Sequence, residues 1–251
     1  IFKVTQPKVN IADNYEDFCK KVTQEILTFS NERIEIQNEF TIVLSGGATP
    51  KGVYQCMASD FYRNKFKWEK IHLFWGDERW VLPDDPKSNY RMVCESLLTK
   101  VKIPSENIHP IQTKDCDLQG SARLYEKTIG DFFKLKKDCF PHFDLILLGL
   151  GQDGHTSSLF PGNPALLVKD RLVVAVSQEG ISEQRITLTL PVVNYAHMVF
   201  FLVSGHEKAG IVAEVLEDKG SRAFPANKIS PGHGKLCWFL DKASASKLPI
   251  T

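Results

Sequence analysis

Short apolar runs alternate with longer amphipathic stretches along most of this 251-residue chain, and that alternation restricts its fold more than any other feature. The apolar runs are rich in β-branched and aromatic residues, as is typical of buried strands. We predict strands at Phe40–Ser45, Ile71–Asp77, Phe143–Leu150, Leu172–Val176 and Met198–Val203.

The stretches between them have apolar residues at helical spacing. We predict helices at Tyr15–Phe29, Pro50–Tyr62, Asn89–Val101, Leu118–Lys136 and His206–Leu216. Strands that are apolar on both faces and alternate with helices indicate an α/β fold, with a mostly parallel sheet covered by helices on both sides. No linker or repeat interrupts the pattern, so we expect residues 1–251 to form a single domain.

Charge and cysteine content exclude several classes of protein. Lys and Arg number 31 against 30 Asp and Glu, so no overall field attracts nucleic acid or an anionic membrane. Apolar runs fall well short of the roughly 20 residues that a membrane-spanning helix needs. The six cysteines are scattered and show no zinc-binding spacing, which predicts free thiols in a reducing, cytoplasmic compartment.

In parallel α/β folds, ligands bind at the carboxyl ends of the strands, so functional motifs should begin where predicted strands stop. Ser45–Pro50 follows the first such strand and reads SGGATP. Its Gly46 and Gly47 amides and the hydroxyls of Ser45 and Thr49, at a helix start with Pro50 as first residue, would suit an anion. An ordinary strand-to-helix turn remains the alternative.

A second charged motif, Gly76–Trp80, ends the next predicted strand. It places Asp77 and Arg79 at the same sheet edge, where buried charges must be paired or used. Asn89, further along, is a candidate cap for the following helix. A solvated surface cluster would read the same way.

Gly149–Thr156, which reads GLGQDGHT, follows the third strand. It contains a G-x-G-x-x-G pattern, but Pro161 and Pro164 come too soon for the helix that a dinucleotide site requires. The motif presents Asp153 and His155, and a neutral imidazole beside a carboxylate can take a proton from water. A structural histidine in the turn is the alternative.

Two further cations complete the candidate site. Lys208 follows the predicted strand Met198–Val203 at a helix start, where a lysine opposes the helix dipole and favours a nearby anion. Arg185 begins a strand-like run, so its direction relative to the site is open. The remaining histidines have no metal-ligand spacing, so no metal is expected.

Together these segments resemble the 6-phosphogluconolactonase family. The matching stretches are SGGATP, GDERWV with SNY, GLGQDGHTSSLFPG, RITLTLPVVNYA and VSGHEKA. The resemblance implies a Rossmann-like fold and hydrolysis of 6-phospho-D-glucono-1,5-lactone in the oxidative pentose phosphate pathway, without metal or organic cofactor. Some relatives are fused to glucose-6-phosphate dehydrogenase, so fusion to or cooperation with that enzyme is a further expectation.

We expect His155 to be the general base and Arg79 to stabilise the oxyanion. Asp77 and Asp153 would orient the imidazole or the attacking water, and the sequence leaves open which of them orients which group. The remaining candidates bind substrate: Ser45, Gly46, Gly47, Thr49, Asn89, Gly154, Arg185 and Lys208. Two alternatives stay open, a glucosamine-6-phosphate deaminase or isomerase and a non-catalytic sugar-phosphate binder. Deaminases carry a glutamate after the D-G-H motif, whereas Thr156–Gly162 here contains no acid.

Overall fold

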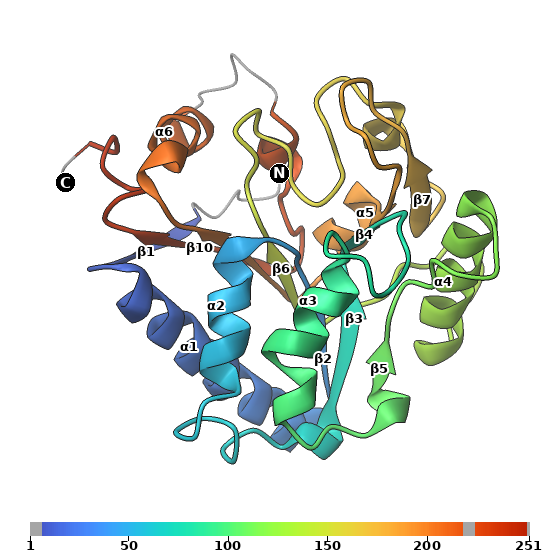
Figure 1. Cartoon of the computed structure of the whole chain (residues 1–251), viewed down its shortest axis with the longest axis horizontal. Coiled ribbons are helices and arrows are strands. Elements are labelled where there is room, and N and C mark those ends of the chain that lie inside the picture. Colours follow the sequence, from blue (N-terminus) through green and yellow to red (C-terminus); the bar gives the residue numbers. More distant parts are fainter. Residues whose placement is uncertain (1–6, 218–223, 250–251) are drawn as a thin grey trace.

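The computed structural model describes residues 7–217 and 224–249 of the chain. Its centre is a seven-stranded parallel sheet (Figure 1). In spatial order the strands are β1 (Lys8–Ala12), β10 (Lys235–Asp241), β9 (Met198–Val203), β6 (Leu145–Leu148), β2 (Phe40–Leu44), β3 (Ile71–Trp75) and β5 (Ile108–His109). The edge strand β1 and its neighbour β10 were not predicted from the sequence.

Helices cover both faces of this sheet, which confirms the predicted α/β class. On one side lie α1 (Tyr15–Gln37), α2 (Ala48–Met57) and α3 (Asn89–Ser96). On the other lie α4 (Leu118–Phe132), α5 (Leu190–Asn194) and α6 (Ala209–Glu217). Short 3₁₀ turns occur at Trp68–Lys70, Leu98–Lys100, Ser105–Asn107, Pro164–Leu167, His206–Lys208 and Pro225–Lys228.

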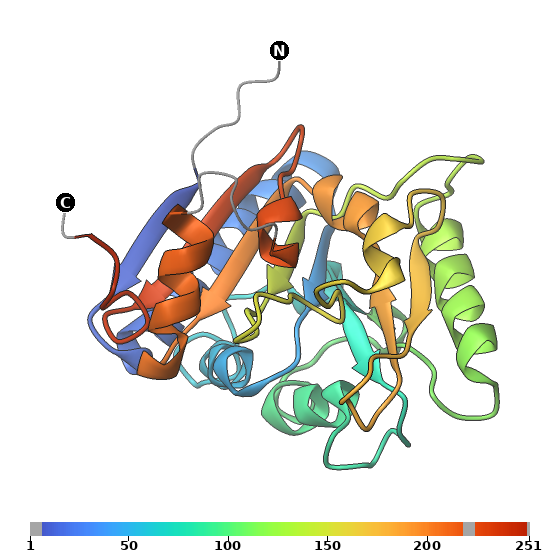
Figure 2. The same cartoon turned by 90° about the horizontal axis from the view of Figure 1, so that it is seen from above.

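A second, three-stranded sheet lies beside the first. It consists of β4 (Asp77–Arg79), β8 (Arg185–Leu188) and β7 (Val173–Val176), all paired antiparallel. The apolar run Leu172–Val176 therefore does form a strand, but outside the main sheet. Helix α4 packs against β7, and Figure 2 shows β7 and β8, in gold and orange, next to this green helix.

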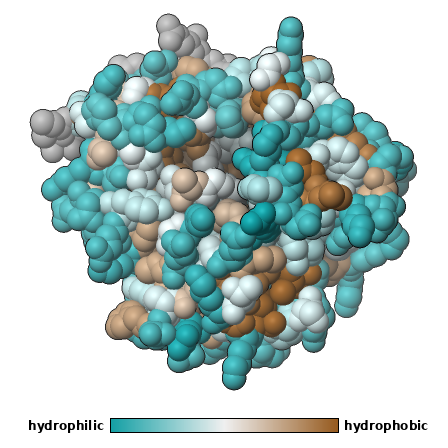
Figure 3. Space-filling view, in the orientation of Figure 1, coloured by the Kyte–Doolittle hydropathy of each residue, from teal (hydrophilic) through white to brown (hydrophobic). Residues whose placement is uncertain are grey.

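A continuous cluster of buried apolar side chains fills the space between the helices and the sheets. The central strand β2 is buried along its whole length, as expected for a strand covered on both faces. Figure 3 shows that hydrophilic residues cover much of the outer face in this view, with hydrophobic groups scattered among them. Within the described ranges, no helix combines the length and the apolar character needed to cross a membrane.

Three local predictions need correction. Helix α2 begins at Ala48, so Pro50 is its third residue rather than its first. The cap of α3 is Ser88, whose hydroxyl accepts from the Arg91 N–H, and Asn89 is the first helical residue. Helix α3 ends at Ser96 instead of Val101, because the chain tightens into a 3₁₀ turn at Leu98–Lys100.

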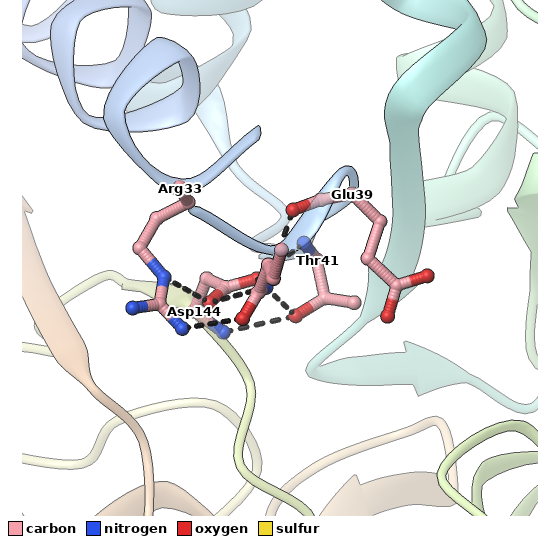
Figure 4. A network of polar contacts seen from close by, with 5 residues as sticks. Arg33, Glu39, Thr41 and Asp144 are labelled. Atoms are coloured by element: carbon pink, nitrogen blue, oxygen red, sulfur yellow. Dashed lines mark hydrogen bonds and ion pairs between the residues drawn. The ribbon is translucent and has the colours of Figure 1, made fainter. Parts of the chain in front are cut away.

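A buried polar network ties the amino ends of β2 and β6 together (Figure 4). The Asp144 carboxylate, 1% exposed, accepts from Arg33 Nε at 2.7 Å and from the Thr41 backbone N–H at 2.8 Å. The Thr41 hydroxyl donates to the Asp144 carboxylate at 3.0 Å and accepts from the Asp144 backbone N–H at 2.9 Å. These contacts fix the register of the two strands whose opposite ends carry the glycine-rich loops.

Candidate active site

The segments that follow β2, β3, β6 and β9 enclose a cavity of about 690 Å³ at the carboxyl edge of the main sheet. The order of the strands reverses between β2 and β6, since β3 and β5 extend one way and β9 and β10 the other. Loops from two such neighbours diverge and leave a crevice between them. All of the predicted site residues except Thr49 and Gly154 line this cavity.

The loop Ser45–Gly47 forms the β2 side of the cavity. Gly47 has φ 103°, which favours glycine, and directly precedes helix α2. Gly46 lies against the neighbouring loop so closely that an added Cβ would be 1.9 Å from Asn89 Oδ1. The backbone is therefore exposed to a ligand at the start of a helix, where N–H groups are free to bind an anion.

Thr49, the second residue of α2, lies outside the cavity lining. Its carbonyl accepts a hydrogen bond from the Tyr15 hydroxyl at 3.0 Å, and that hydroxyl also reaches the Ala48 carbonyl at 3.1 Å. Tyr15 thus braces the first turn of α2 from the neighbouring helix α1.

His155 and Asp153 form a close pair on the β6 side. The Asp153 Oδ1 lies 2.5 Å from His155 Nδ1 and accepts from the His155 backbone N–H at 3.1 Å. With Nδ1 donating to the carboxylate, Nε2 holds the lone pair of the ring. Burial raises the pKa of Asp153, but the hydrogen bonds and charge of His155 outweigh it, so the pKa is lowered overall.

Two glycines shape the turn that carries His155 and Asp153. An added Cβ on Gly151 would lie 2.1 Å from His155 Nδ1, so only glycine leaves room for the ring. Gly154 has φ 77°, and a Cβ there would lie 2.5 Å from a Phe224 ring carbon. Gly154 therefore shapes the turn without lining the cavity. The imidazole packs on Phe160, with ring centroids 4.7 Å apart.

Asp77 lines the same cavity but contacts other groups. Its Oδ2 accepts from the Ser158 hydroxyl at 2.6 Å, and its Oδ1 accepts from Asn89 Nδ2 at 3.3 Å. The sequence left open which aspartate lies beside the imidazole, and the structure puts Asp153 there.

Three cations face the cavity. Arg79 and Arg185 are directly paired residues of β4 and β8, and both line the cavity. Burial, followed by the charge of Arg79, lowers the pKa of Arg185. The Arg79 Nε is buried and has no hydrogen-bond partner within the described part of the chain. Lys208 donates to the Leu150 carbonyl at 2.8 Å. This cluster of positive charge suits an anionic ligand.

Glu78 binds backbone N–H groups beside the cavity, and the sequence did not predict it as a site residue. Its carboxylate, with the residue only 2% exposed, accepts from the backbone N–H groups of Arg79, Asn89 and Tyr90 at 2.7–2.8 Å. Burial raises the pKa of Glu78, and these three N–H donors oppose that rise. The sequence feature that could have indicated its role is a second carboxylate, directly after Asp77 at a strand end, with no obvious partner.

Several other lining residues were also missed: Gln152, Ser157, Phe160, Gly180, Ile181, Ser182 and Glu183. Most of them belong to the segment between β7 and β8, whose approach to the cavity depends on the antiparallel sheet. All six cysteines are free thiols, and in residues 7–217 and 224–249 no three histidine, cysteine or acidic side chains are grouped to hold a metal ion.

Comparison with known proteins gives a consistent result. The family model described as "Glucosamine-6-phosphate isomerases/6-phosphogluconolactonase" matches residues 13–238. The chain is 41% identical to a 6-phosphogluconolactonase of Synechocystis sp. over 243 residues, covering 96% of this chain and 98% of that protein. It is 43% identical to one from Nostoc sp. over 226 residues, covering 90% and 91%.

Solved structures agree with these relatives. A 6-phosphogluconolactonase from Trypanosoma brucei superimposes with a TM-score of 0.84 at 29% identity, covering 97% of this chain and 99% of that one. The Trypanosoma cruzi enzyme gives a TM-score of 0.86 at 27% identity, covering 99% and 98%. A monomeric glucosamine-6-phosphate deaminase, at 21% identity and a TM-score of 0.79, shares the fold.

Proposed function

Because this chain belongs to the glucosamine-6-phosphate isomerase/6-phosphogluconolactonase family, we propose that it hydrolyses 6-phospho-D-glucono-1,5-lactone to 6-phosphogluconate, the reaction of the oxidative pentose phosphate pathway. The observation that carries this proposal is the His155–Asp153 pair, which shares one cavity with three cations. A phosphorylated lactone needs both a base for water and a positive site for its phosphate.

The phosphate lies at the Gly46–Gly47 amides, where Lys208 and Arg185 neutralise its charge. Both cations line the cavity, and the start of α2 has no acidic residue that would repel an anion. Anchoring the phosphate there fixes the lactone ring across the strand ends, so binding energy far from the reacting bond orients the carbonyl.

His155 Nε2 then removes a proton from a water molecule, and the resulting hydroxide attacks the C1 carbonyl. Asp153 stabilises the imidazolium that forms and holds Nδ1–H in place. Arg79, which lines the cavity, stabilises the tetrahedral oxyanion with its positive charge. The imidazolium returns its proton to the departing ring oxygen, which completes ring opening. Asp77 and Asn89, bonded to each other, hold the sugar hydroxyls.

The test is a coupled assay of lactone consumption, corrected for spontaneous hydrolysis, on wild type and His155→Ala. We expect wild-type turnover far above the spontaneous rate, and a loss of kcat by orders of magnitude in His155→Ala with little change in KM. Wild type that matches the spontaneous rate would refute the proposal. Ammonia release from glucosamine 6-phosphate would instead identify a deaminase, and binding of the phosphorylated sugar without turnover would identify a non-catalytic binder.

A further inference from the structure

An ion pair joins two loops at the rim of the cavity. Lys87 lies in the segment between β4 and α3, and Glu183 lies in the segment between β7 and β8. The Lys87 Nζ donates to Glu183 Oε1. The two residues are 96 positions apart in the chain, so this contact joins two loops beyond the point where the pairing of β4 with β8 ends.

Each member of the pair also holds one of the cavity arginines. The carbonyl of Lys87 accepts from Arg79 Nη1 at 2.6 Å. The carbonyl of Glu183 accepts from Arg185 Nε at 3.3 Å, and its Oε2 lies 3.9 Å from Arg185 Nη2. The Trp80 backbone N–H donates to the Gln184 carbonyl at 2.8 Å, which extends the pairing of β4 with β8 by one hydrogen bond next to these contacts.

Directly paired residues of neighbouring antiparallel strands have Cβ atoms about 5 Å apart on the same face of the sheet, so these two positively charged side chains repel each other. Burial is the main cause of the lowered pKa of Arg185, and the charge of Arg79 is the second. Unrestrained side chains would relieve the repulsion by turning apart. The two carbonyls and the Glu183 carboxylate prevent this by fixing the donors of both groups.

We propose that the ion pair between Lys87 and Glu183 is a latch that holds the two cavity arginines side by side, ready for one anionic substrate. Both latch residues are positioning residues and take no part in the chemistry. The Glu183 side chain is 15% exposed and that of Lys87 59%, so the pair is accessible to solvent on the lysine side. The hydrogen bond from Lys87 lowers the pKa of Glu183 to about 2, so the pair stays charged over the whole neutral range.

This inference depends on the proposed function only for the identity of the anion, so its test uses inorganic phosphate as a probe. Binding of phosphate is measured by calorimetry for wild type, Lys87→Met, Glu183→Gln and the double variant. We expect each single variant to weaken phosphate binding about three- to ten-fold. The double variant should bind phosphate about as tightly as the weaker-binding single variant, because either change alone already breaks the ion pair.

Two controls separate the latch from a general loss of charge or stability. Lys87→Arg keeps the charge and should bind phosphate nearly as wild type does. Lys136→Met removes one exposed positive charge from the segment after α4 and should change binding less than two-fold. Thermal unfolding of every variant, measured without phosphate, should stay within a few degrees of wild type.

Single variants that bind phosphate within two-fold of wild type, additive effects in the double variant, or wild type that binds no phosphate would each overturn the latch. Turnover of the phosphorylated lactone is followed in parallel. A chain that fails to hydrolyse the lactone but whose phosphate binding follows the expected pattern would refute the proposed function and leave the latch standing. Normal turnover of the lactone, together with variants whose phosphate binding is unchanged, would refute the latch and leave the proposed function standing.

Discussion

Replacing Asp153 with asparagine tests the proposed proton transfer most directly. When His155 takes a proton from water, its ring becomes positively charged, and Asp153 Oδ1 lies only 2.5 Å from Nδ1. Two unit charges with centres about 3–4 Å apart attract by about 1–5.5 kcal/mol at effective dielectric constants between about 20 and 80. The His155 side chain is 32% exposed and that of Asp153 52%, so solvent screening places the pair in the lower part of that range.

A stabilisation of about 1.4–2.7 kcal/mol that exists only once the ring is charged corresponds to a ten- to hundred-fold change in kcat. Asparagine can also turn its amide toward Nδ1 and donate to it, which favours the tautomer in which Nε2 carries the hydrogen and cannot act as a base. We therefore expect Asp153→Asn to lower kcat by about ten- to a hundred-fold with KM within about three-fold, measured by the coupled lactone assay.

A second arm removes the base as well. If Asp153 acts through His155, Asp153→Asn should cause no further loss in a His155→Ala background, because the interaction it supplies is already gone. Retention of more than a third of wild-type kcat by Asp153→Asn, or a full additional loss in the double variant, would refute the reasoning.

Lys208→Met should raise KM for the phosphorylated lactone about ten- to a hundred-fold and leave turnover of unphosphorylated gluconolactone unchanged; equal losses on both substrates would contradict a phosphate role. Burial, and then the charge of His72, lowers the pKa of His109 to about 4, whereas a histidine in the unfolded chain titrates near 6.5. Between those values the unfolded state binds the extra proton, so the free energy of unfolding should fall as pH decreases from about 6.5 to about 4. Urea titrations across this range should show that His109→Phe has a shallower slope, and an unchanged slope would assign the pH dependence elsewhere. Asp144→Asn should lower the free energy of unfolding by about 2–4 kcal/mol, because the partly buried Arg33 guanidinium loses its charged partner; a urea midpoint near that of wild type would show that the network contributes little.

The sequence was sufficient to predict which loops would line a common cavity, because parallel strands end at a common edge. Each of the loops beginning at Ser45, Gly76 and Gly149 follows a strand that it was predicted to follow, and the strand reversal between β2 and β6 brings them together. What the sequence could not provide was the side on which Arg185 lies. That depends on β8 running antiparallel to β4, and no local pattern in RITLTLP determines the partner of a short strand.

The same limit explains the other misses. Ser88 and Asn89 are both good capping residues, and only the three-dimensional path of the chain makes Ser88 the cap while the Asn89 amide turns to Asp77. Glu183 read as one more surface carboxylate, since its partner Lys87 lies on a different loop. Contacts of this kind arise from how loops meet, and that is decided by packing far from either residue.

The glycines connect these two levels. Gly46 and Gly151 each lie against a side chain that lines the cavity, with no room for a Cβ: Gly46 against Asn89 at the start of α3, and Gly151 against His155 of its own loop. A motif rich in glycine is therefore more than a flexible turn here, since its missing side chains leave space for Asn89 beside one loop and for the imidazole within the other. The glycine pattern that the sequence displays most plainly therefore determines how two of the side chains that line the cavity pack against its backbone.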